Sequence, residues 1–205
     1  MAVVVQISSY EELRKIIEES GKEYDRAKIE QAYRLAEEKH QDQKRSSGEP
    51  YIIHPLSVAA ILVGLGMDSE SVMAGLLHDV VEDTDCTIEE IQKTFGKEVA
   101  LLIDGVTKLT KIPYSSREEQ QAENLRKMLM AMAEDIRVII IKFADRMHNL
   151  STLEYMSPQK QRDKAVECLE VYAPIADRLG IRTVKEYMED ISLKYLDPQA
   201  YREIE

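Results

Sequence analysis

Several features that would place this chain in a special class are missing. Its 205 residues include only two cysteines, Cys86 and Cys168, which is too few for a disulfide framework and is typical of a reducing compartment. No apolar run reaches the roughly 18 residues that cross a bilayer. The short run at residues 3–5 has no basic segment before it and no processing site after it, so it does not resemble a signal peptide. The sequence predicts a cytoplasmic protein with no membrane partner.

Basic residues and glycine-rich or proline-rich segments are also scarce. The 27 Lys and Arg residues are outnumbered by 38 Asp and Glu, for a net charge of −11, so no DNA partner is expected. With 8 Gly, 6 Pro and no low-complexity tract, collagen-like and linker-rich architectures are excluded. A hydrophobic share of 44% is too high for a disordered chain. The length is sufficient to bury a core without disulfides or a structural metal.

Helix signals are dense. Ile29, Ala32 and Ala36 follow a 3.6-residue period and predict one buried helix face. Further helix starts are predicted where a capping side chain precedes a glutamate by three residues, precedes a proline, or follows a glycine break. These capping residues are Ser9, Asp68, Thr87, Ser157 and Asp197.

Strand signals are few. Residues 137–143 (RVIIIKF) have the composition of either a buried strand or a buried helix. The run continues to Leu153 without glycine or proline, which favours a helix. Residues 43–55 and 108–119 are predicted loops, and the segment 104–108 (DGVTK) is predicted to be a structural turn. No linker or repeat divides the sequence, which predicts one all-α domain.

Four ionisable residues stand directly against apolar segments. His78 and Asp79 follow an apolar helix turn. His54 lies within an apolar stretch, and Asp145 follows another. A lone His-Asp pair is typical of a helix surface, but a buried pair needs a partner, and a divalent cation is one. Two imidazoles and two carboxylates suit Mn, Fe, Co or Zn better than Ca or Mg.

Two further carboxylates follow on the same predicted helix. Glu82 lies four residues after His78, and Asp83 lies four residues after Asp79, so each pair shares a helix face. In one interpretation these acids position and deprotonate an attacking water. In the other they form a solvated acidic helix end. Spacing alone leaves both open.

Four motifs together carry a family resemblance. They are SGEPYIIHP at residues 47–55, HDVVEDT at 78–84, DGVTK at 104–108 and ADRMHN at 144–149. In this order they resemble the hydrolase domain of the RelA/SpoT homologue family, whose enzymes make and degrade the alarmones ppGpp and pppGpp. Synthetase-only relatives lack the His-Asp pair, so its presence here implies a competent hydrolase.

The resemblance implies a fold, a metal and a reaction. The fold is an HD-superfamily helical bundle around a metal site over residues 1–195, with residues 196–205 beginning a connection to a downstream domain. One Mn²⁺ ion is implied, bound by His54, His78, Asp79 and Asp145, with Glu82 and Asp83 activating water. The implied reaction releases the 3′-diphosphate of ppGpp or pppGpp as pyrophosphate and leaves GDP or GTP, as in the stringent response.

A polyanionic substrate requires a local cationic patch on this acidic protein. By resemblance, Arg45 and its neighbours contact the guanine base, and a guanidinium plane can stack on a purine. Lys142 and Arg146 either support the phosphates or are ordinary surface or ion-pair residues. The implied substrate-binding set is Arg45, Ser46, Ser47, Lys142, Arg146, Asn149 and Thr152.

The end of the sequence bears on its organisation. At Glu205 the chain is too short for the synthetase domain of bifunctional family members. It is therefore a natural small hydrolase or a fragment, and residues 172–195, which resemble the approach to that domain, favour a fragment. Ribosome contact is expected only through such absent domains.

Two other functions stay open. One is a different HD nucleotide phosphohydrolase, against which the Arg45 loop and the Asn149 region argue. The other is a non-catalytic alarmone-binding module, against which the complete set of ligand and acid residues argues.

Two serines depart from the family pattern. Many relatives carry a basic residue at the position of Ser46 and an arginine at that of Ser151. We predict that Ser46→Lys lowers the KM for ppGpp, because a second cation beside Arg45 attracts the anionic substrate. Steady-state kinetics measures this, and an unchanged or raised KM contradicts the prediction.

Overall fold

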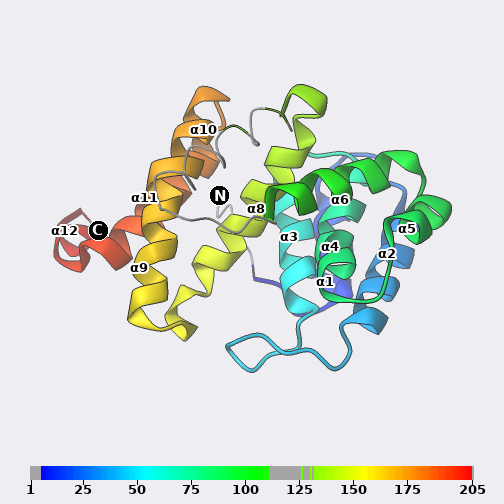
Figure 1. Cartoon of the computed structure of the whole chain (residues 1–205), viewed down its shortest axis with the longest axis horizontal. Helices are drawn as coiled ribbons and strands as arrows, with labels where there is room; N and C mark the ends of the chain where they lie inside the picture. Colours follow the sequence, from blue (N-terminus) through cyan, green and yellow to red (C-terminus); the bar gives the residue numbers. More distant parts are fainter. Residues whose placement is uncertain (1–5, 111–125, 127–129, 131, 205) are drawn as a thin grey trace. The chain divides into compact units, whose positions relative to one another are not determined.

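The computed structural model describes residues 6–110, 126, 130 and 132–204, and its regular elements in these ranges are all helices (Figure 1). The predicted all-α class is confirmed. Beyond the helices, one isolated bridge pairs Lys44 with Pro50. Among the described residues, no helix combines the length and apolar character needed to cross a membrane. These residues form two compact units, 6–145 and 146–204, and each is described by itself.

The first unit contains the N-terminal helices. They are α1 (Tyr10–Glu19), α2 (Arg26–Lys39), α3 (Ile53–Gly64), α4 (Ser69–Asp83), α5 (Ile88–Phe95), α6 (Lys97–Thr110) and the first part of α8 (Arg137–Ser151). Every residue of α3 from His54 to Val63 is buried, as expected of a helix that is apolar all round. Helix α4 packs against α2, α3 and α6, so α3 and α4 form the centre of this unit (Figure 1).

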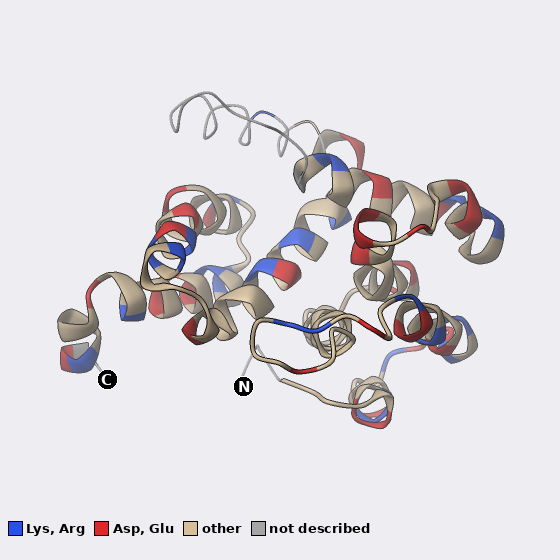
Figure 2. Ribbon diagram, turned by 60° about the horizontal axis from the view of Figure 1, so that its bottom comes forward, with Lys and Arg blue, Asp and Glu red and all other residues tan. Residues whose placement is uncertain are grey.

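The second unit contains the end of α8 and the C-terminal helices. These are η1 (Leu153–Tyr155), α9 (Pro158–Glu167), the π-helical turn η2 (Cys168–Tyr172), α10 (Ala173–Arg178), α11 (Arg182–Leu196) and α12 (Pro198–Ile204). Helix α11 packs against α9, η2 and α10. Basic and acidic residues are interspersed on the helices of both units (Figure 2).

Local signals placed most helix starts correctly. Ser9 and Thr87 form capping boxes with Glu12 and Glu90. Asp68 caps α4 by accepting from the backbone of Ser71. Helices α9 and α12 begin at Pro158 and Pro198. Residues 137–143 are helical, as favoured, because they continue without interruption into the rest of α8.

The predicted loops and turn need correction. The first loop ends at Ile52, because α3 already begins at Ile53. The segment 104–108 lies inside α6 and is not a turn. The second predicted loop overlaps the end of α6 through Thr110, and its remainder, 111–119, lies outside the described residues.

Two helical glycines allow close helix packing. A Cβ at Gly75 of α4 would lie 2.5 Å from Leu62 Cδ1 and 3.4 Å from Val58 Cγ1 of α3. A Cβ at Gly105 of α6 would lie 2.7 Å from Val138 Cγ2 of α8. The glycine of the DGVTK motif therefore has a packing reason, and Gly75 brings α3 and α4 together one turn before His78.

Arg137 fastens the start of α8. Its guanidinium forms ion pairs with Asp68 at 2.8 Å, with Glu98 at 2.8 Å and with Asp135 at 2.6 Å. Asp68 caps α4 and Glu98 lies on α6, so one side chain links three helices of the first unit. This linkage fixes the helix that carries Asp145.

Gly75→Ala should destabilise the protein by about 1–3 kcal/mol, because the added methyl must displace the buried Leu62 side chain. The gain of up to ~1 kcal/mol from alanine's helix propensity offsets only part of a cost in the middle or upper part of this range. Urea unfolding of both proteins measures the difference.

Gly64→Ala is the matched control. It lies at the end of α3, and nothing lies within 4 Å of an added Cβ. This variant should be neutral or more stable by up to ~1 kcal/mol. If both variants unfold at the same urea concentration, close packing at Gly75 is not what the helix pair requires.

Candidate metal centre

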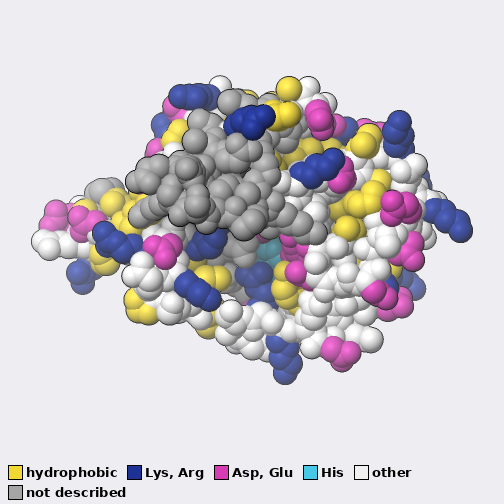
Figure 3. Space-filling model, viewed as in Figure 1, with side chains coloured by type: hydrophobic (Ala, Val, Ile, Leu, Met, Phe, Trp, Pro, Cys, Tyr) yellow, Lys and Arg dark blue, Asp and Glu magenta, His cyan; other side chains and the backbone are white. Residues whose placement is uncertain are grey.

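Three helices of the first unit bring the four predicted metal ligands together. His54 lies in the first turn of α3, His78 and Asp79 lie on α4, and Asp145 lies on α8. His54, His78 and Asp145 are 1%, 2% and 6% exposed. Only a small area of histidine is visible on the face in Figure 3.

The polar atoms of these residues converge. His54 Nε2 lies 3.3 Å from Asp145 Oδ1 and 3.5 Å from Asp79 Oδ2. His78 Nε2 lies 3.2 Å from Asp79 Oδ1 and 4.0 Å from Asp145 Oδ1. His54, His78 and Asp145 each offer a ligand atom within 4.8 Å of the others, so this group could hold one metal ion. Asp79 lies against both imidazoles.

The hydrogen bonding of His78 is compatible with a bound cation. His78 Nδ1 lies 2.8 Å from the carbonyl oxygen of Gly75, which only accepts, so Nδ1 carries the proton and donates. The neutral ring then has its lone pair on Nε2, which is buried and has no hydrogen-bond partner in the described part of the chain. A buried lone pair beside carboxylates needs a proton or a cation between them. A divalent ion satisfies this requirement, and an Nδ1–H to carbonyl bond is typical of metal-binding histidine.

The protonation states suit metal binding. Burial lowers the pKa of His54 below its usual value and outweighs the nearby carboxylates, which raise it. The neutral, ligand form of this imidazole is therefore favoured. Burial acts to raise the pKa of Asp145, but the Lys142 ammonium and the adjacent imidazoles more than offset it, so the pKa lies well below its ordinary value. Asp145 is ionised at neutral pH.

Two further side chains contact the ligand carboxylates. Lys142 Nζ lies 2.9 Å from Asp145 Oδ2, and the Lys142 side chain is only 9% exposed. This contact matches the ion-pair interpretation of Lys142, while its role toward phosphate stays a prediction. Tyr51 Oη donates to Asp79 Oδ2 at 2.7 Å. The sequence assigned no role to Tyr51, although its hydroxyl stands three residues before His54 in an otherwise apolar stretch.

The two predicted catalytic acids end α4. Glu82 is half-buried and Asp83 is exposed. Asp83 Oδ2 lies 3.4 Å from Tyr51 Oη, so Asp79 and Asp83 face the same hydroxyl. Asp83 is therefore an exposed carboxylate one helix turn from Asp79. The catalytic roles of both acids stay predictions.

The predicted guanine-binding residues lie on a short hairpin-like loop. Arg45 N donates to Glu49 O at 2.9 Å, and Gly48 N donates to Arg45 O at 2.9 Å. Gly48 has a φ of +89°, which glycine adopts readily. Ser47 Oγ donates to Glu49 at 3.0 Å, while Ser46 is exposed. The Arg45 guanidinium lies 6.0 Å from the centre of the Tyr51 ring, so this loop reaches the cluster through Tyr51.

The remaining predicted substrate residues belong to the second unit. Arg146 contacts Glu167 at 3.2 Å and the Tyr172 hydroxyl at 3.0 Å, with its guanidinium 4.5 Å from that ring. The ion-pair alternative for Arg146 therefore has a partner. Asn149 is half-buried. The hydroxyl of Thr152 donates back to the carbonyls of the preceding helical turn. Their substrate contacts stay predictions.

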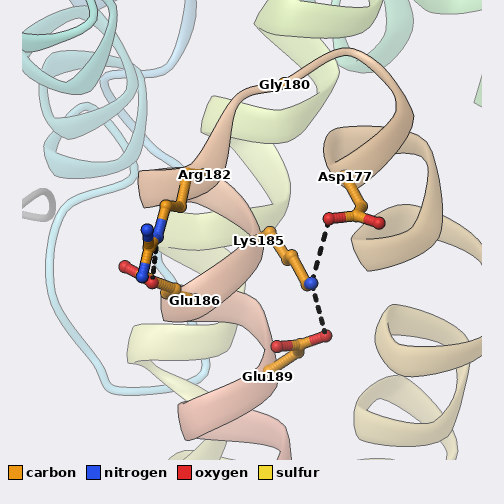
Figure 4. A pocket seen from close by; sticks show the side chains of 6 residues that line it. All are labelled: Asp177, Gly180, Arg182, Lys185, Glu186 and Glu189. Carbon is orange, nitrogen blue, oxygen red and sulfur yellow. Dashed lines mark hydrogen bonds and ion pairs between the residues drawn. The ribbon is translucent and has the colours of Figure 1, made fainter.

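A hollow of about 380 Å³ also occurs in the second unit (Figure 4). Its two cations are both paired with carboxylates. Arg182 contacts Glu186 at 2.6 Å, and Lys185 contacts Asp177 at 2.9 Å. This hollow therefore presents no unbalanced positive charge to an anion.

Comparison with known proteins agrees with the cluster. The HD domain family matches residues 32–182, and the chain belongs to this family. It is 54% identical over 174 residues to a probable guanosine-3′,5′-bis(diphosphate) 3′-pyrophosphohydrolase of Synechocystis, covering 85% of this chain and 23% of that protein. It is 48% identical over 195 residues to the bifunctional (p)ppGpp synthase/hydrolase SpoT of Escherichia coli, covering 95% and 28%.

Two other similar proteins differ from these in their name or in the length of their chain. A GTP pyrophosphokinase of Streptomyces coelicolor is 53% identical over 176 residues, covering 86% of this chain and 20% of that protein. The chain thus spans about a quarter of the length of these relatives. A solved structure of a metazoan SpoT orthologue that hydrolyses ppGpp is 27% identical, with a TM-score of 0.55, and covers 89% of this chain and 98% of that one.

A first-row divalent ion should raise the melting temperature of metal-stripped protein. At a concentration of ~100 times Kd, binding adds about 2.7 kcal/mol, or about 5–10 °C for a chain of this size. Asp145→Ala should abolish the shift, because it removes a charged ligand atom. Differential scanning fluorimetry with and without Mn²⁺ or Co²⁺ measures it.

Asp104→Ala is the control. Asp104 pairs with Lys108 on α6, much as Asp145 pairs with Lys142 on α8, but it stands outside the cluster. This variant should keep the metal-induced shift. A shift retained by Asp145→Ala would place metal binding elsewhere.

Proposed function

We propose that this chain is a Mn²⁺-dependent (p)ppGpp 3′-pyrophosphohydrolase domain. The observation that carries this proposal is the buried cluster of two histidines and two aspartates, with two further acids beside it, in an HD-family chain about half identical to proteins named for that activity. The orthologue that hydrolyses ppGpp is covered over 98% of its length, which supports hydrolysis by a chain of this size. We propose that the hydrolase domain spans residues 1–195.

We propose that His54, His78, Asp79 and Asp145 hold the ion. Their mixed nitrogen and oxygen donors favour a first-row metal, and Mn²⁺ fits a set with two carboxylates. When bound, the ion supplies Lewis acidity that polarises a phosphoryl oxygen and eases the ionisation of water. Lys142, by pairing with Asp145, keeps that carboxylate ionised and oriented.

In this proposal Glu82 and Asp83 position the attacking water and accept its proton. Water attacks the phosphorus that is joined to the ribose O3′, and the O3′–phosphorus bond breaks. The new oxygen leaves with pyrophosphate, and O3′ takes up a proton to give GDP or GTP. Asp83 is exposed, so it can pass its proton to solvent and be ready for the next turnover.

The substrate is held, in this proposal, by the loop that carries Arg45, Ser46 and Ser47. Arg45 supplies a planar cation for the guanine, and the serine hydroxyls supply hydrogen bonds. Lys142, Arg146, Asn149 and Thr152 are proposed to support the phosphates and sugar. Because the whole chain carries a net charge of −11, binding of an anionic alarmone requires a local group of cations such as these Lys and Arg side chains.

Purified protein should release pyrophosphate from ppGpp only when Mn²⁺ is present. Asp79→Ala should lose both turnover and the metal-induced thermal shift, because it removes a carboxylate that contacts both imidazoles. Asp83→Asn should keep the thermal shift but lose about 10²–10⁴ in kcat, because it removes only a proton acceptor. Coupled pyrophosphate detection measures these rates.

Asp85→Asn is the control for Asp83. Asp85 is an exposed carboxylate two residues further on, paired with Lys39 at 2.6 Å, and its loss should leave kcat unchanged. Dephosphorylation of deoxynucleotides or cyclic nucleotides in place of ppGpp would indicate a different HD phosphohydrolase. Tight ppGpp binding without any release would indicate an alarmone-binding module.

A further inference from the structure

The hydroxyl of Tyr51 stands between a proposed metal ligand and a proposed catalytic acid. It lies 2.7 Å from Asp79 Oδ2 and 3.4 Å from Asp83 Oδ2. Ionised carboxylates only accept, so the hydroxyl donates, and its single proton lies in the shorter contact, with Asp79.

The rest of Tyr51 is fixed to the loop proposed to bind substrate. Its backbone N–H donates to Gln43 O at 3.0 Å. Its ring lies 4.7 Å from the ring of His40 at a tilt of 34°, and 6.0 Å from the Arg45 guanidinium. Gln43 in turn bonds His40 Nδ1 at 2.8 Å and the Asp83 carbonyl at 3.2 Å. The ring and backbone therefore hold the hydroxyl in place.

We propose that Tyr51 is a positioning residue that sets the orientation of Asp79 for metal binding and links it to the Arg45 loop. This inference rests on the proposed function. A carboxylate turns easily about its last torsion, because that torsion is broad. The Tyr51 hydroxyl holds Oδ2, which leaves Oδ1 at 3.2 Å from His78 Nε2. Each carboxylate of the cluster then has one oxygen bound by a residue that is not a proposed metal ligand. Tyr51 binds Asp79 Oδ2, and Lys142 binds Asp145 Oδ2.

Tyr51 differs from Lys142 in carrying no charge. A lysine beside the site repels an incoming cation while it orients its carboxylate, whereas a tyrosine hydroxyl only orients. Removing the Tyr51 hydroxyl therefore leaves the net charge of the site unchanged. A change in metal affinity in such a variant reports orientation alone, and groups that orient ligands typically contribute 10–100-fold to affinity.

Tyr51→Phe should weaken Mn²⁺ binding about tenfold or more, measured by calorimetry on metal-stripped protein. Its thermal stability without metal should stay close to that of the wild type. Its kcat should recover toward wild type as Mn²⁺ is raised to saturation, with little change in the KM for ppGpp, because the ring is kept. Tyr51→Leu should in addition raise this KM, because the ring beside Arg45 is lost.

Tyr24→Phe is the matched control. Tyr24 is half-buried, and its hydroxyl donates to the Met67 carbonyl at 2.8 Å, away from the cluster. Tyr24→Phe should bind Mn²⁺ as the wild type does.

Equal Mn²⁺ affinity in the wild type and Tyr51→Phe would overturn the inference and leave the proposed function standing. A wild type that binds Mn²⁺ but does not hydrolyse ppGpp would overturn the proposed function, while the difference in affinity would still decide the role of Tyr51. A wild type that does not bind Mn²⁺ would overturn both.

Discussion

The cluster of two histidines and two aspartates in the first unit depends on one buried lone pair, that of His78 Nε2. His78 Nε2 faces two carboxylates, and its own proton is committed at Nδ1 to the carbonyl of Gly75. Burying unpaired polar groups costs several kcal/mol, and a cation bound among the four side chains would offset this cost. The backbone carbonyl of Gly75 fixes the tautomer of His78. The fold of α4 itself therefore leaves the lone pair of His78 on Nε2, where it can bind a metal ion.

Close helix packing makes this convergence possible. Gly75 has no side chain, so α4 approaches α3 and their imidazoles come within 5.4 Å between ring centres. Arg137 then links the start of α8 to α4 and α6 through ion pairs. Residues 137–143, whose composition also fits a strand, are the first part of the helix that carries Asp145. The ligands sit on rigid helices, whereas the proposed substrate contacts at Arg45 to Ser47 sit on a loop. Tyr51 connects the two, because its hydroxyl contacts Asp79 and its ring lies beside Arg45.

Much of the fold and of the cluster could be predicted from the sequence, because capping residues and buried ionisable residues are local signals. Capping residues such as Ser9, Asp68 and Thr87 act within one turn and located their helices. Ionisable residues beside apolar runs located the cluster, since burial makes such residues costly without a partner. The role of Tyr51 was missed because its partner Asp79 lies 28 residues away, a distance that periodicity does not bridge. The sequence predicts a turn at residues 104–108, but this segment is helical, because Gly105 serves helix packing against Val138 rather than a turn.

We expect one divalent ion to bind between α3, α4 and α8, at His54, His78, Asp79 and Asp145. The most direct test is anomalous diffraction at the manganese edge from crystals of the Mn²⁺-loaded protein. We expect a single strong peak at about 2 Å from Nε2 of both His54 and His78 and from oxygens of Asp79 and Asp145. A peak outside this cluster, or none at saturating Mn²⁺, would contradict the account.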